Sequence, residues 1–464
     1  MGWPNNFVQG VYDSTGKVVG VEDGVGGEIG FIQKTSSMFG KYTDKVNYLI
    51  SKCIGFGSSA PDTATRAGLT PANTFFYHPQ LGSDANSGLT HLLPKQNLPA
   101  SPDSVGALGL VANTKYLIAS GSTLTLAGTN ANFIRVQANS PSNIIMSVYD
   151  SDATSPTYGQ EILNQPNPFV RALAGMWITA AEKAKYYFTL DVNTPPNVAT
   201  QTRAFFMYHN GSIATVGKIC LRGAVIKNAT VGALQIRNAD VRFEDCVVEK
   251  MLQDPDISGG TGGFGIRNEA NGNFDGARIW MSEVGEDCFW LYDSIAPYGC
   301  TNSLVDSAVW HTCDMQKNTG QHSDIFQFNS YPKNFVFRRL AIVHLVQDKA
   351  LVGGDTNSGG AVLVSTGALG TDTPGGLMED VVFITNHQGT YMQKQSGVTF
   401  RRCVGLLVKR KVGAPTDLIT WEKGNNVEDN CVWAIETGMT QKHRKMQIPA
   451  TAYSNYSNSV EIEV

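Results

Sequence analysis

Apolar and polar residues alternate in a series of short segments through the middle of the chain. An apolar residue opens each segment, the fourth position is small or apolar except at Asp380, and the sixth position is usually β-branched. Because successive side chains of a strand point to opposite faces, this pattern predicts strands that turn one side toward a common core. The segments are LRGAVIK from Leu221, FEDCVVE from Phe243, IWMSEVG from Ile279, LVDSAVW from Leu304, FRRLAIV from Phe337, LMEDVVF from Leu377 and FRRCVGL from Phe400.

The segments recur at intervals of roughly 22 to 40 residues, which matches one coil of a solenoid with loops of different length inserted. A second series supports a repeat. GALQIRN (232–238) and GGFGIRN (262–268) share Ile-Arg-Asn, and DCFWLYD (287–293) and DIFQFNS (324–330) continue the same register. The sequence therefore predicts an all-β, single-stranded parallel β-helix. A β-propeller is the alternative, and it would require antiparallel hairpins at a more constant period.

The second series predicts which side chains face inward and which face outward. The inward set is Ile236, Ile266, Phe289 and Phe326, and the outward set is Arg237, Arg267, Trp290 and Gln327. Outward side chains on adjacent coils lie about 4.8 Å apart, a spacing that suits a long polymer. Aromatic rings and hydrogen-bonding groups on such a face are typical of carbohydrate binding.

Composition narrows the possible partners. The net charge is −4, the sequence pI is about 6.1, and Lys and Arg do not cluster among aromatics, which makes nucleic acid an unexpected ligand. The sequence has no apolar run long enough to span a membrane, and MGWPNNFVQG lacks the features of a signal peptide. The eight cysteines are dispersed without CxxC spacing, so neither a zinc site nor a disulfide framework is expected.

Residues 72–415 resemble the pectate-lyase-like right-handed β-helix proteins. TFFYHPQLGSDANSGLTHLLP (74–94) is similar to the entry segment of that group. Its Asp, Asn and Gly residues suit a tight turn, and a Ca²⁺ or ligand role is the alternative.

VYDSTGKVVGVEDGVGGEI (11–29) is similar to short β-turn modules near the N-termini of bacteriophage tail proteins, although it also suits a Gly-rich hairpin. Together the two regions resemble a phage tailspike or tail-fibre depolymerase. That resemblance implies a homotrimer in the virion tail that binds and cuts bacterial surface polysaccharide. A secreted bacterial enzyme is the alternative. The family shares architecture more than catalytic residues, so the resemblance assigns no catalytic set.

Three regions are predicted along the chain. Residues 1–70 form an attachment or capping region, in which FIQKTSSMFGKYTDKVNYLISK (31–52) is the expected helix covering an end of the solenoid. Residues 71–415 form the β-helix, and residues 416–464 form a C-terminal cap or oligomerisation segment. Outward apolar positions of the solenoid would then meet across a threefold axis.

Two aspartates begin equivalent strands of the second series, so they are expected one coil apart. A pair of carboxylates in which one has a raised pKa is what glycosidic hydrolysis requires, whereas a strand-start aspartate can also cap backbone amides. The histidine of GQHSDIFQF (320–328) precedes the second aspartate by two residues and shares its face of an extended strand. The predicted catalytic residues are Asp287, Asp324, Glu286 and His322.

The predicted substrate-binding residues lie around the same coils. They comprise the outward set, its neighbours, and Asp314 on the segment before His322: Arg237, Arg267, Glu269, Trp290, Tyr292, Gln327, Asn329 and Asp314. A separate column of residues, each seven positions after its segment start, is expected to form a corner of the solenoid. Its members are Lys250, Glu286, His311 and His344. The histidines lack ligand spacing, so no metal site is predicted.

Three functions remain open from the sequence. A polysaccharide hydrolase would depend on the carboxylate pair. A polysaccharide lyase would depend on Arg237, Arg267 and His322, with Ca²⁺ as an optional cofactor. A receptor-binding spike would bind glycan without cutting it.

Overall fold

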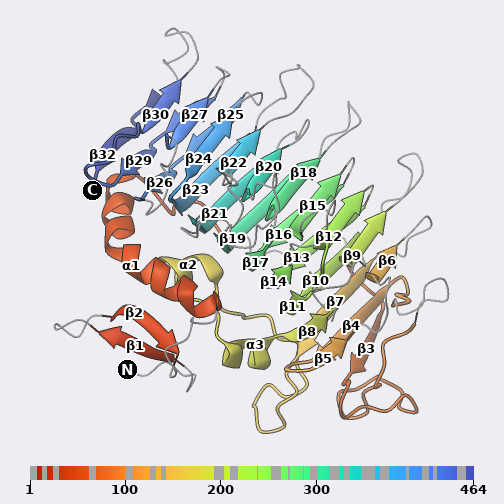
Figure 1. Cartoon of the computed structure of the whole chain (residues 1–464). Helices are drawn as coiled ribbons and strands as arrows, with labels where there is room; N and C mark the ends of the chain where they lie inside the picture. The colour runs from red at the N-terminus through yellow and green to blue at the C-terminus, as the bar shows by residue number, and fades with distance from the viewer. Residues whose placement is uncertain are drawn as a thin grey trace, which may run out of the picture.

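The computed structural model describes residues 8–12, 18–23, 31–61, 69–100, 108–125, 132–136, 143–192, 203–208, 218–237, 239–251, 263–269, 272–285, 287–292, 301–312, 324–328, 335–345, 361–365, 376–392, 397–409, 417–421, 426–446 and 456–464. Within these residues the chain winds into a parallel β-helix, as the alternation predicted (Figure 1). One coil shows the course of the chain: β13 (Asp240–Glu244), β14 (Val247–Met251) and β15 (Phe264–Glu269) each pair in parallel with strands of adjacent coils. We call the three sides of the coils faces 1, 2 and 3.

Within the described residues, face 3 is a ten-stranded parallel sheet. Its strands are β6 (Asn132–Val136), β9 (Arg203–Tyr208), β12 (Gly232–Arg237), β15, β18 (Phe289–Tyr292), β20 (Phe326–Phe328), β22 (Ala361–Ser365), β24 (Gln388–Met392), β27 (Ile419–Trp421) and β30 (Arg444–Met446).

Faces 1 and 2 are joined in one parallel sheet that bends sharply and that has twenty strands in the part of the chain that the structure describes. Face 1 contains β3 (Asn73–Tyr77), β4 (Thr114–Ala119), β7 (Ile144–Tyr149), β10 (Lys218–Arg222), β13, β16 (Asn273–Ala277), β25 (Val398–Arg401), β28 (Val427–Asp429) and β31 (Tyr456–Ser457). Face 2 contains β5 (Thr123–Thr125), β8 (Phe188–Asp191), β11 (Ala224–Lys227), β14, β17 (Trp280–Val284), β26 (Val404–Leu407), β29 (Val432–Ile435) and β32 (Val460–Glu463). Three strands continue through the bend, namely β19 (Thr301–Thr312), β21 (Phe335–Leu345) and β23 (Gly376–Thr385).

From β10 to β32, the bend between faces 1 and 2 uses one left-handed residue in each coil. Most side chains disfavour this backbone conformation, and here successive coils alternate acidic and basic residues whose side chains pair. Arg278 Nε lies 2.6 Å from Asp245 Oδ1, and Arg402 Nε lies 2.7 Å from Asp380 Oδ1. We call this column the corner ladder. Its residues, with φ between 49° and 65°, are Gly223, Asp245, Arg278, Asp306, Arg339, Asp380, Arg402, Asn430 and Asn458.

Two of the predicted segment starts are out of register. Phe400 pairs with Met378, so that coil begins one residue after Leu377 and Asp380 is its corner residue. Phe243 pairs with Gly276, so the next coil begins three residues before Ile279. A glycine has no side chain, and the hydrophobic pattern therefore cannot mark an inward position that glycine occupies.

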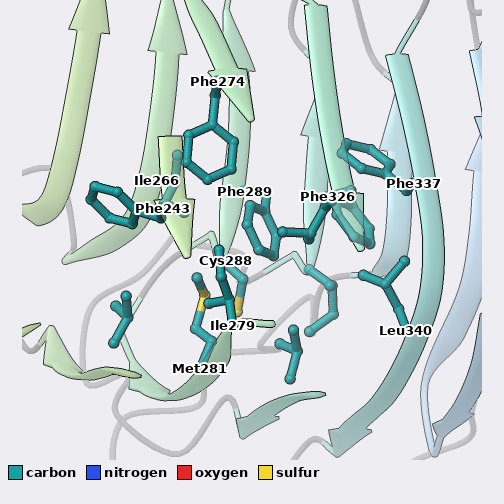
Figure 2. Packing of buried hydrophobic residues seen from close by; sticks show 14 of the residues in the cluster. Phe243, Ile266, Phe274, Ile279, Met281, Cys288, Phe289, Phe326, Phe337 and Leu340 are labelled. Atoms are coloured by element: carbon teal, nitrogen blue, oxygen red, sulfur yellow. The ribbon is translucent and has the colours of Figure 1, made fainter. Parts of the chain in front are cut away.

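The core lies inside the coils and is filled by stacked apolar side chains. The predicted inward residues Ile236, Ile266, Phe289 and Phe326 are all buried, which confirms that part of the pattern. Phe326 packs between Phe289 and Phe337, with ring centroids 5.1 Å and 4.5 Å apart respectively (Figure 2). Face 3 and face 1 thus contribute to one aromatic stack, which fixes the position of face 3 relative to the rest of the coil.

A second apolar cluster covers the outside of face 2. The helix α1 (Phe31–Lys52) has the predicted bounds, but it packs beside β26 and β29 instead of covering an end of the solenoid (Figure 1). The helices α2 (Pro168–Leu173) and α3 (Ala180–Tyr186) lie between β7 and β8 in the sequence, and Trp177 between them packs edge-to-face on Trp280 at 4.9 Å. The outward apolar residues of face 2 are therefore covered by the chain itself.

The first coil is covered by residues 78–97. Tyr77 and Lys95 form a parallel bridge, so this segment extends face 1 by part of a further coil. Asp84 accepts hydrogen bonds from the backbone and side-chain nitrogens of Asn97, at 2.9 Å and 2.7 Å. These contacts join the GSDANSG turn to Asn97, and within the turn Asn86 N donates to Ser83 O at 2.9 Å.

The β-helix continues past residue 415, where the sequence suggested a separate cap. β27 pairs with β30, β28 with β31 and β29 with β32, all in parallel. The boundary was wrong because this region repeats the same pattern, with Asn430 as corner residue and Cys431 facing inward. At the other end of the chain, β1 (Val8–Tyr12) and β2 (Val18–Asp23) form an antiparallel hairpin.

The described cysteines and helices bear on two further expectations. Six cysteines are described, and each is a buried free thiol. Among the described helices, none combines the length and hydropathy that a membrane span requires.

Candidate functional site

The outer side of face 3 carries a row of polar and aromatic side chains on consecutive coils. Gln235 pairs in register with Arg267, Arg267 with Trp290, and Trp290 with Gln327. Three members of the predicted outward set, Arg267, Trp290 and Gln327, therefore lie in one row as expected. Gln235 continues this row on the preceding coil, and the sequence-based prediction missed it.

Arg237 does not lie in that row, because the repeated Ile-Arg-Asn segments are offset by two residues. Ile236 pairs with Asn268, so Arg237 lies level with Glu269 rather than with Arg267. A shift of two residues keeps every side chain on its predicted face but changes its neighbour, since strand side chains alternate with a period of two. Glu269 pairs with Tyr292 on the next coil, and the side chain of Tyr292 lies outside the described structure.

Glu269 is the carboxylate at the centre of this region. Its Oε1 lies 2.7 Å from Arg267 Nε and accepts a hydrogen bond of 2.8 Å from Gln235 Nε2. Its Oε2 lies 3.8 Å from Arg237 Nε. The Glu269 side chain is 7% exposed, whereas those of Arg237 and Arg267 are 25% and 18% exposed. We call Gln235, Arg237, Arg267, Glu269 and Trp290 the Glu269 cluster.

Trp290 orients the neighbouring guanidinium group. Arg267 Cζ lies 4.0 Å from the centroid of the Trp290 ring, and Phe264 contacts the same indole edge-to-face. A cation over an indole face is attracted by the ring quadrupole, and the contact also fixes the arginine side chain. Arg267 is thereby held between the indole and Glu269, and the half-buried Trp290 remains at the surface of face 3.

Asp287 and Asp324 lie on adjacent coils as predicted, but both are buried and both accept backbone hydrogen bonds. Asp287 Oδ1 accepts from Asp324 N at 3.0 Å, and Asp324 Oδ1 accepts from Ala361 N at 2.5 Å. Asp417, for which no chemistry was predicted, accepts from Lys442 N in the same way. The catalytic assignment is therefore corrected. Each of these aspartates ties one coil to the next, which is the capping role that the sequence left as the alternative.

Replacing Asp324 separates these two roles. Asp324→Ala removes the acceptor of a buried amide, so we expect it to lower the free energy of unfolding by about 1–3 kcal/mol. Asp324→Asn keeps an acceptor oxygen, so we expect near wild-type stability and, per folded molecule, an unchanged rate of the polysaccharide hydrolysis that the sequence predicts. Denaturant unfolding and an activity assay of both variants provide the check. A folded Asn variant that has lost a hundredfold or more of its activity would restore the catalytic assignment.

Several predicted site residues lie outside the described structure. They are Glu286, His322, Asn329 and Asp314, together with the side chains of Tyr292 and His311. Among the described residues, no group of three or more His, Cys, Asp or Glu side chains is arranged to hold a metal ion.

The predicted corner column contains Glu283 in place of Glu286. Lys250 lies between pairs that match Glu249 with Ser282 and Met251 with Val284, which places it opposite Glu283. The sequence-based prediction started this coil at Ile279, three residues too late. It therefore assigned Glu286 to the column instead of Glu283. His344 is buried and lies 3.2 Å through Nδ1 from Thr385 Oγ1, so it belongs to the interior of its coil.

Burial raises the pKa of Glu283 to about 7, an effect that Glu249 increases and that Lys250 and Lys183 oppose. Glu283 Oε2 is buried without a hydrogen-bond partner among the described residues. Glu249, by contrast, pairs with Lys183 Nζ at 2.8 Å. Glu283 is thus a carboxyl group whose charged form costs stability in the folded chain.

Glu283→Gln is expected to stabilise the protein at high pH. The folded chain holds a proton that the unfolded chain releases near pH 4.5, so stability is full below that pH and falls as the pH rises through about 7. Above pH 7 the variant should be more stable than wild type by up to about 3 kcal/mol, with little difference at pH 4. Guanidinium unfolding at both pH values measures this, with the exposed Glu463→Gln as control. An equal difference at pH 4 and pH 8 would refute the expectation.

No family model and no curated protein matches the chain. Among solved structures, the chain is similar to the native crystal structure of the GH136 lacto-N-biosidase from Eubacterium ramulus, with a TM-score of 0.41 and 10% identity over 84% of this chain and 68% of that chain. The selenomethionine derivative of the same protein gives a TM-score of 0.31 and 11% identity over 84% and 67% of the two chains. Function is therefore inferred from the chain's own residues.

Proposed function

We propose that the protein binds and depolymerises a bacterial surface polysaccharide along the outer side of face 3. The observation that supports this is the Glu269 cluster, which sets a carboxylate between hydrogen-bonding groups and an indole on three consecutive coils. Coils repeat about every 4.8 Å, so equivalent groups recur at a spacing close to that of successive units of an extended polymer. Indole rings bind sugar faces, and amide and guanidinium groups bind hydroxyls.

Glycosidic hydrolysis is the reaction we favour. Glu269 would be the carboxylate that acts as base or nucleophile, and the contacts with Arg267 and Gln235 would hold its orientation. A second carboxyl group is needed as the acid. The sequence offers Glu286, directly before Asp287, and Asp314, in the segment that connects β19 to β20. Asp287 and Asp324 would support the coils that carry the site.

Elimination at a uronic acid is the second candidate, and one observation favours it. Arg237 and Arg267 flank the same carboxylate from adjacent coils. Paired guanidinium groups would neutralise the carboxylate of a uronate and so make its C5 proton easier to remove, with Glu269 as the base. A glycan-binding spike would use the same cluster without either reaction.

The place of action belongs to the same proposal. The resemblance of residues 11–29 to N-terminal modules of phage tail proteins supports a virion tail component that reaches the host surface, with its N-terminal region toward the tail. The β1–β2 hairpin and α1 lie in that region, outside the coils of the β-helix. A homotrimer is the assembly we would expect there.

The proposal is tested on purified capsule, exopolysaccharide and lipopolysaccharide from candidate hosts. New reducing ends and the ultraviolet absorbance of unsaturated uronates are followed together. Reducing ends without absorbance indicate hydrolysis, and both together indicate elimination. Retention of a glycan without either signal indicates the binding spike. A protein that neither retains nor cleaves any of these polymers would refute the proposed function.

A further inference from the structure

Two amide side chains lie in one row on the outer side of face 3. Gln235 pairs in register with Arg267, Arg267 with Trp290, and Trp290 with Gln327. We call these four residues the face 3 row. The residues on either side of each amide belong to the core, namely Leu234, Ile236, Phe326 and Phe328. Because side chains alternate along a strand, both amides point outward.

Both amides are buried and have unused hydrogen-bonding capacity. Gln235 is 8% exposed, and its Nε2 donates to Glu269, whereas its Oε1 is buried without a hydrogen-bond partner among the described residues. Gln327 is 7% exposed, and its side chain has no hydrogen-bond partner in the described part of the chain. A buried amide group without a partner costs free energy, and a ligand hydroxyl at each amide would remove that cost.

A single amide of this kind does not identify a site. Gln165, which precedes α2, is also 8% exposed, and its Oε1 is likewise buried without a described partner while its Nε2 donates to Ile162 O at 3.1 Å. The face 3 row differs because two such amides flank the half-buried indole of Trp290 on one line across the coils. Hydrogen-bonding groups on both sides of an indole suit a glycan, whose units offer hydroxyls at their edges and apolar faces to a ring.

The spacing of the face 3 row sets the length of such a glycan. Three coil steps separate Gln235 from Gln327, which corresponds to about 14 Å. With one sugar unit per coil, a glycan needs about four units to reach from one amide to the other. A glycan that ran along one strand instead would reach only one of the two amides.

We infer that the face 3 row binds a glycan segment of about four units that runs across the coils. A hydroxyl at one end of the segment donates to Gln235, a sugar ring packs on Trp290, and a hydroxyl at the other end bonds to Gln327. This inference rests on the proposed function and adds to it the direction of the glycan, its minimum length and two residues that determine specificity. Neighbouring side chains cover Gln235 Oε1, so binding there requires a rotamer change, which is common at binding interfaces.

The experiment measures how the affinity of the full chain depends on ligand length. The probe is the host polysaccharide that the wild type retains or cleaves, cut by partial acid hydrolysis into a ladder of oligosaccharides. Each oligosaccharide competes with the intact polymer for binding or cleavage in the cold, which gives its dissociation constant. We expect affinity to rise up to about four units and then to level off. Affinity that is already constant from the disaccharide onward would contradict the inference.

Two variants test the ends of the site. Gln235→Leu and Gln327→Leu should each weaken binding of the four-unit oligosaccharide about threefold to tenfold, the contribution of one hydrogen bond. The matched control is Gln165→Leu, which removes an equally buried amide away from the face 3 row and should bind as the wild type does. Without glycan, Gln327→Leu should unfold at the same denaturant concentration as the wild type or a higher one, because its amide has no described partner to lose.

The outcomes separate the inference from the function it rests on. If the wild type retains or cleaves a host polysaccharide and either amide variant binds the oligosaccharide as tightly, the inference is overturned and the proposed function stands. Equal weakening by Gln165→Leu, or a loss of stability in Gln327→Leu, would show a structural amide and also overturn the inference. A wild type that neither retains nor cleaves any host polysaccharide refutes both.

Discussion

Glu269→Gln is expected to reduce glycan cleavage by a factor of about 10²–10⁴, the range typical of a lost acid–base group. Glutamine keeps the size of the side chain and can still accept the hydrogen bond that Gln235 donates. It cannot serve as a base or nucleophile, so the loss should fall on the turnover number. Initial rates of reducing-end release, at several polymer concentrations, measure the effect.

A matched variant controls for the loss of an ion pair. Glu249→Gln removes a similarly buried glutamate, 6% exposed and paired with Lys183, on face 2. It should leave cleavage per folded molecule unchanged. If Glu269→Gln cleaves the polymer as fast as Glu249→Gln does, Glu269 is not the reacting carboxylate.

Asp380→Ala is expected to lower the free energy of unfolding by about 3–5 kcal/mol, as when one partner of a buried ion pair is removed. Asp380 is fully buried and pairs with Arg402 in the corner ladder. Its two carboxylate oxygens also accept from Gly57 N and Ser59 N, both at 2.9 Å. The carboxylate thus connects residues that follow α1 to a coil far along the chain, and its loss removes several contacts together.

The same contacts predict a pH dependence. Burial alone would raise the pKa of Asp380, but hydrogen bonds from Arg402, Ser59 and Gly57 outweigh it and lower the pKa below 3.8. Because the folded pKa is depressed, the stabilisation is present above pH 3.8 and is lost as the pH falls through the lower, folded value. The difference in the free energy of unfolding between wild type and Asp380→Ala should therefore become smaller as the pH falls below 3.8.

Asp429→Ala is the control for this effect. Asp429 pairs with Arg401 at 3.1 Å on the neighbouring column, where the side chains are 35% and 40% exposed. Exposed ion pairs contribute little to stability, so we expect Asp429→Ala to lower the free energy of unfolding by about 1 kcal/mol or less. Guanidinium unfolding of both variants gives the comparison. Losses of equal size would mean that the corner ladder is no more important than a surface pair.

The sequence predicts the fold because the β-helix depends on local alternation. Inward residues such as Phe326 and Phe328 follow each other at period two within a strand, and α1 is amphipathic over its whole predicted length. The register between strands of adjacent coils was harder to predict from the sequence. Gly276 occupies an inward position without an apolar side chain, and the corner ladder places Asp and Arg where a left-handed residue is required.

The outward row of the site was predictable for the same reason, and the role of the two strand-start aspartates was not. Arg267, Trp290 and Gln327 follow from alternation alone. Asp287 and Asp324 were misassigned because a capping aspartate and a catalytic aspartate occupy the same place before a strand. Asp417 begins DLITW as Asp287 begins DCFWL, and this third copy in a coil without other candidate residues could have indicated a structural role.

Contacts between distant parts of the chain could not be predicted from local patterns. Cys53 donates to the carbonyl of Asn430 at 3.0 Å, and Lys45 pairs with Glu436 at 2.8 Å. Amphipathic spacing shows that α1 buries one side, but it does not show against which face. The placement of α1 beside β26 and β29 follows from the outward apolar residues of face 2.

The most direct test is a crystal structure of Glu269→Gln with an oligosaccharide produced by the wild-type protein, or with the polymer fragment that it retains. The account predicts that the sugar lies on the outer side of face 3, across β12, β15 and β18, in contact with Arg267 and Trp290. A sugar bound on face 1, or over the helices that cover face 2, would contradict it.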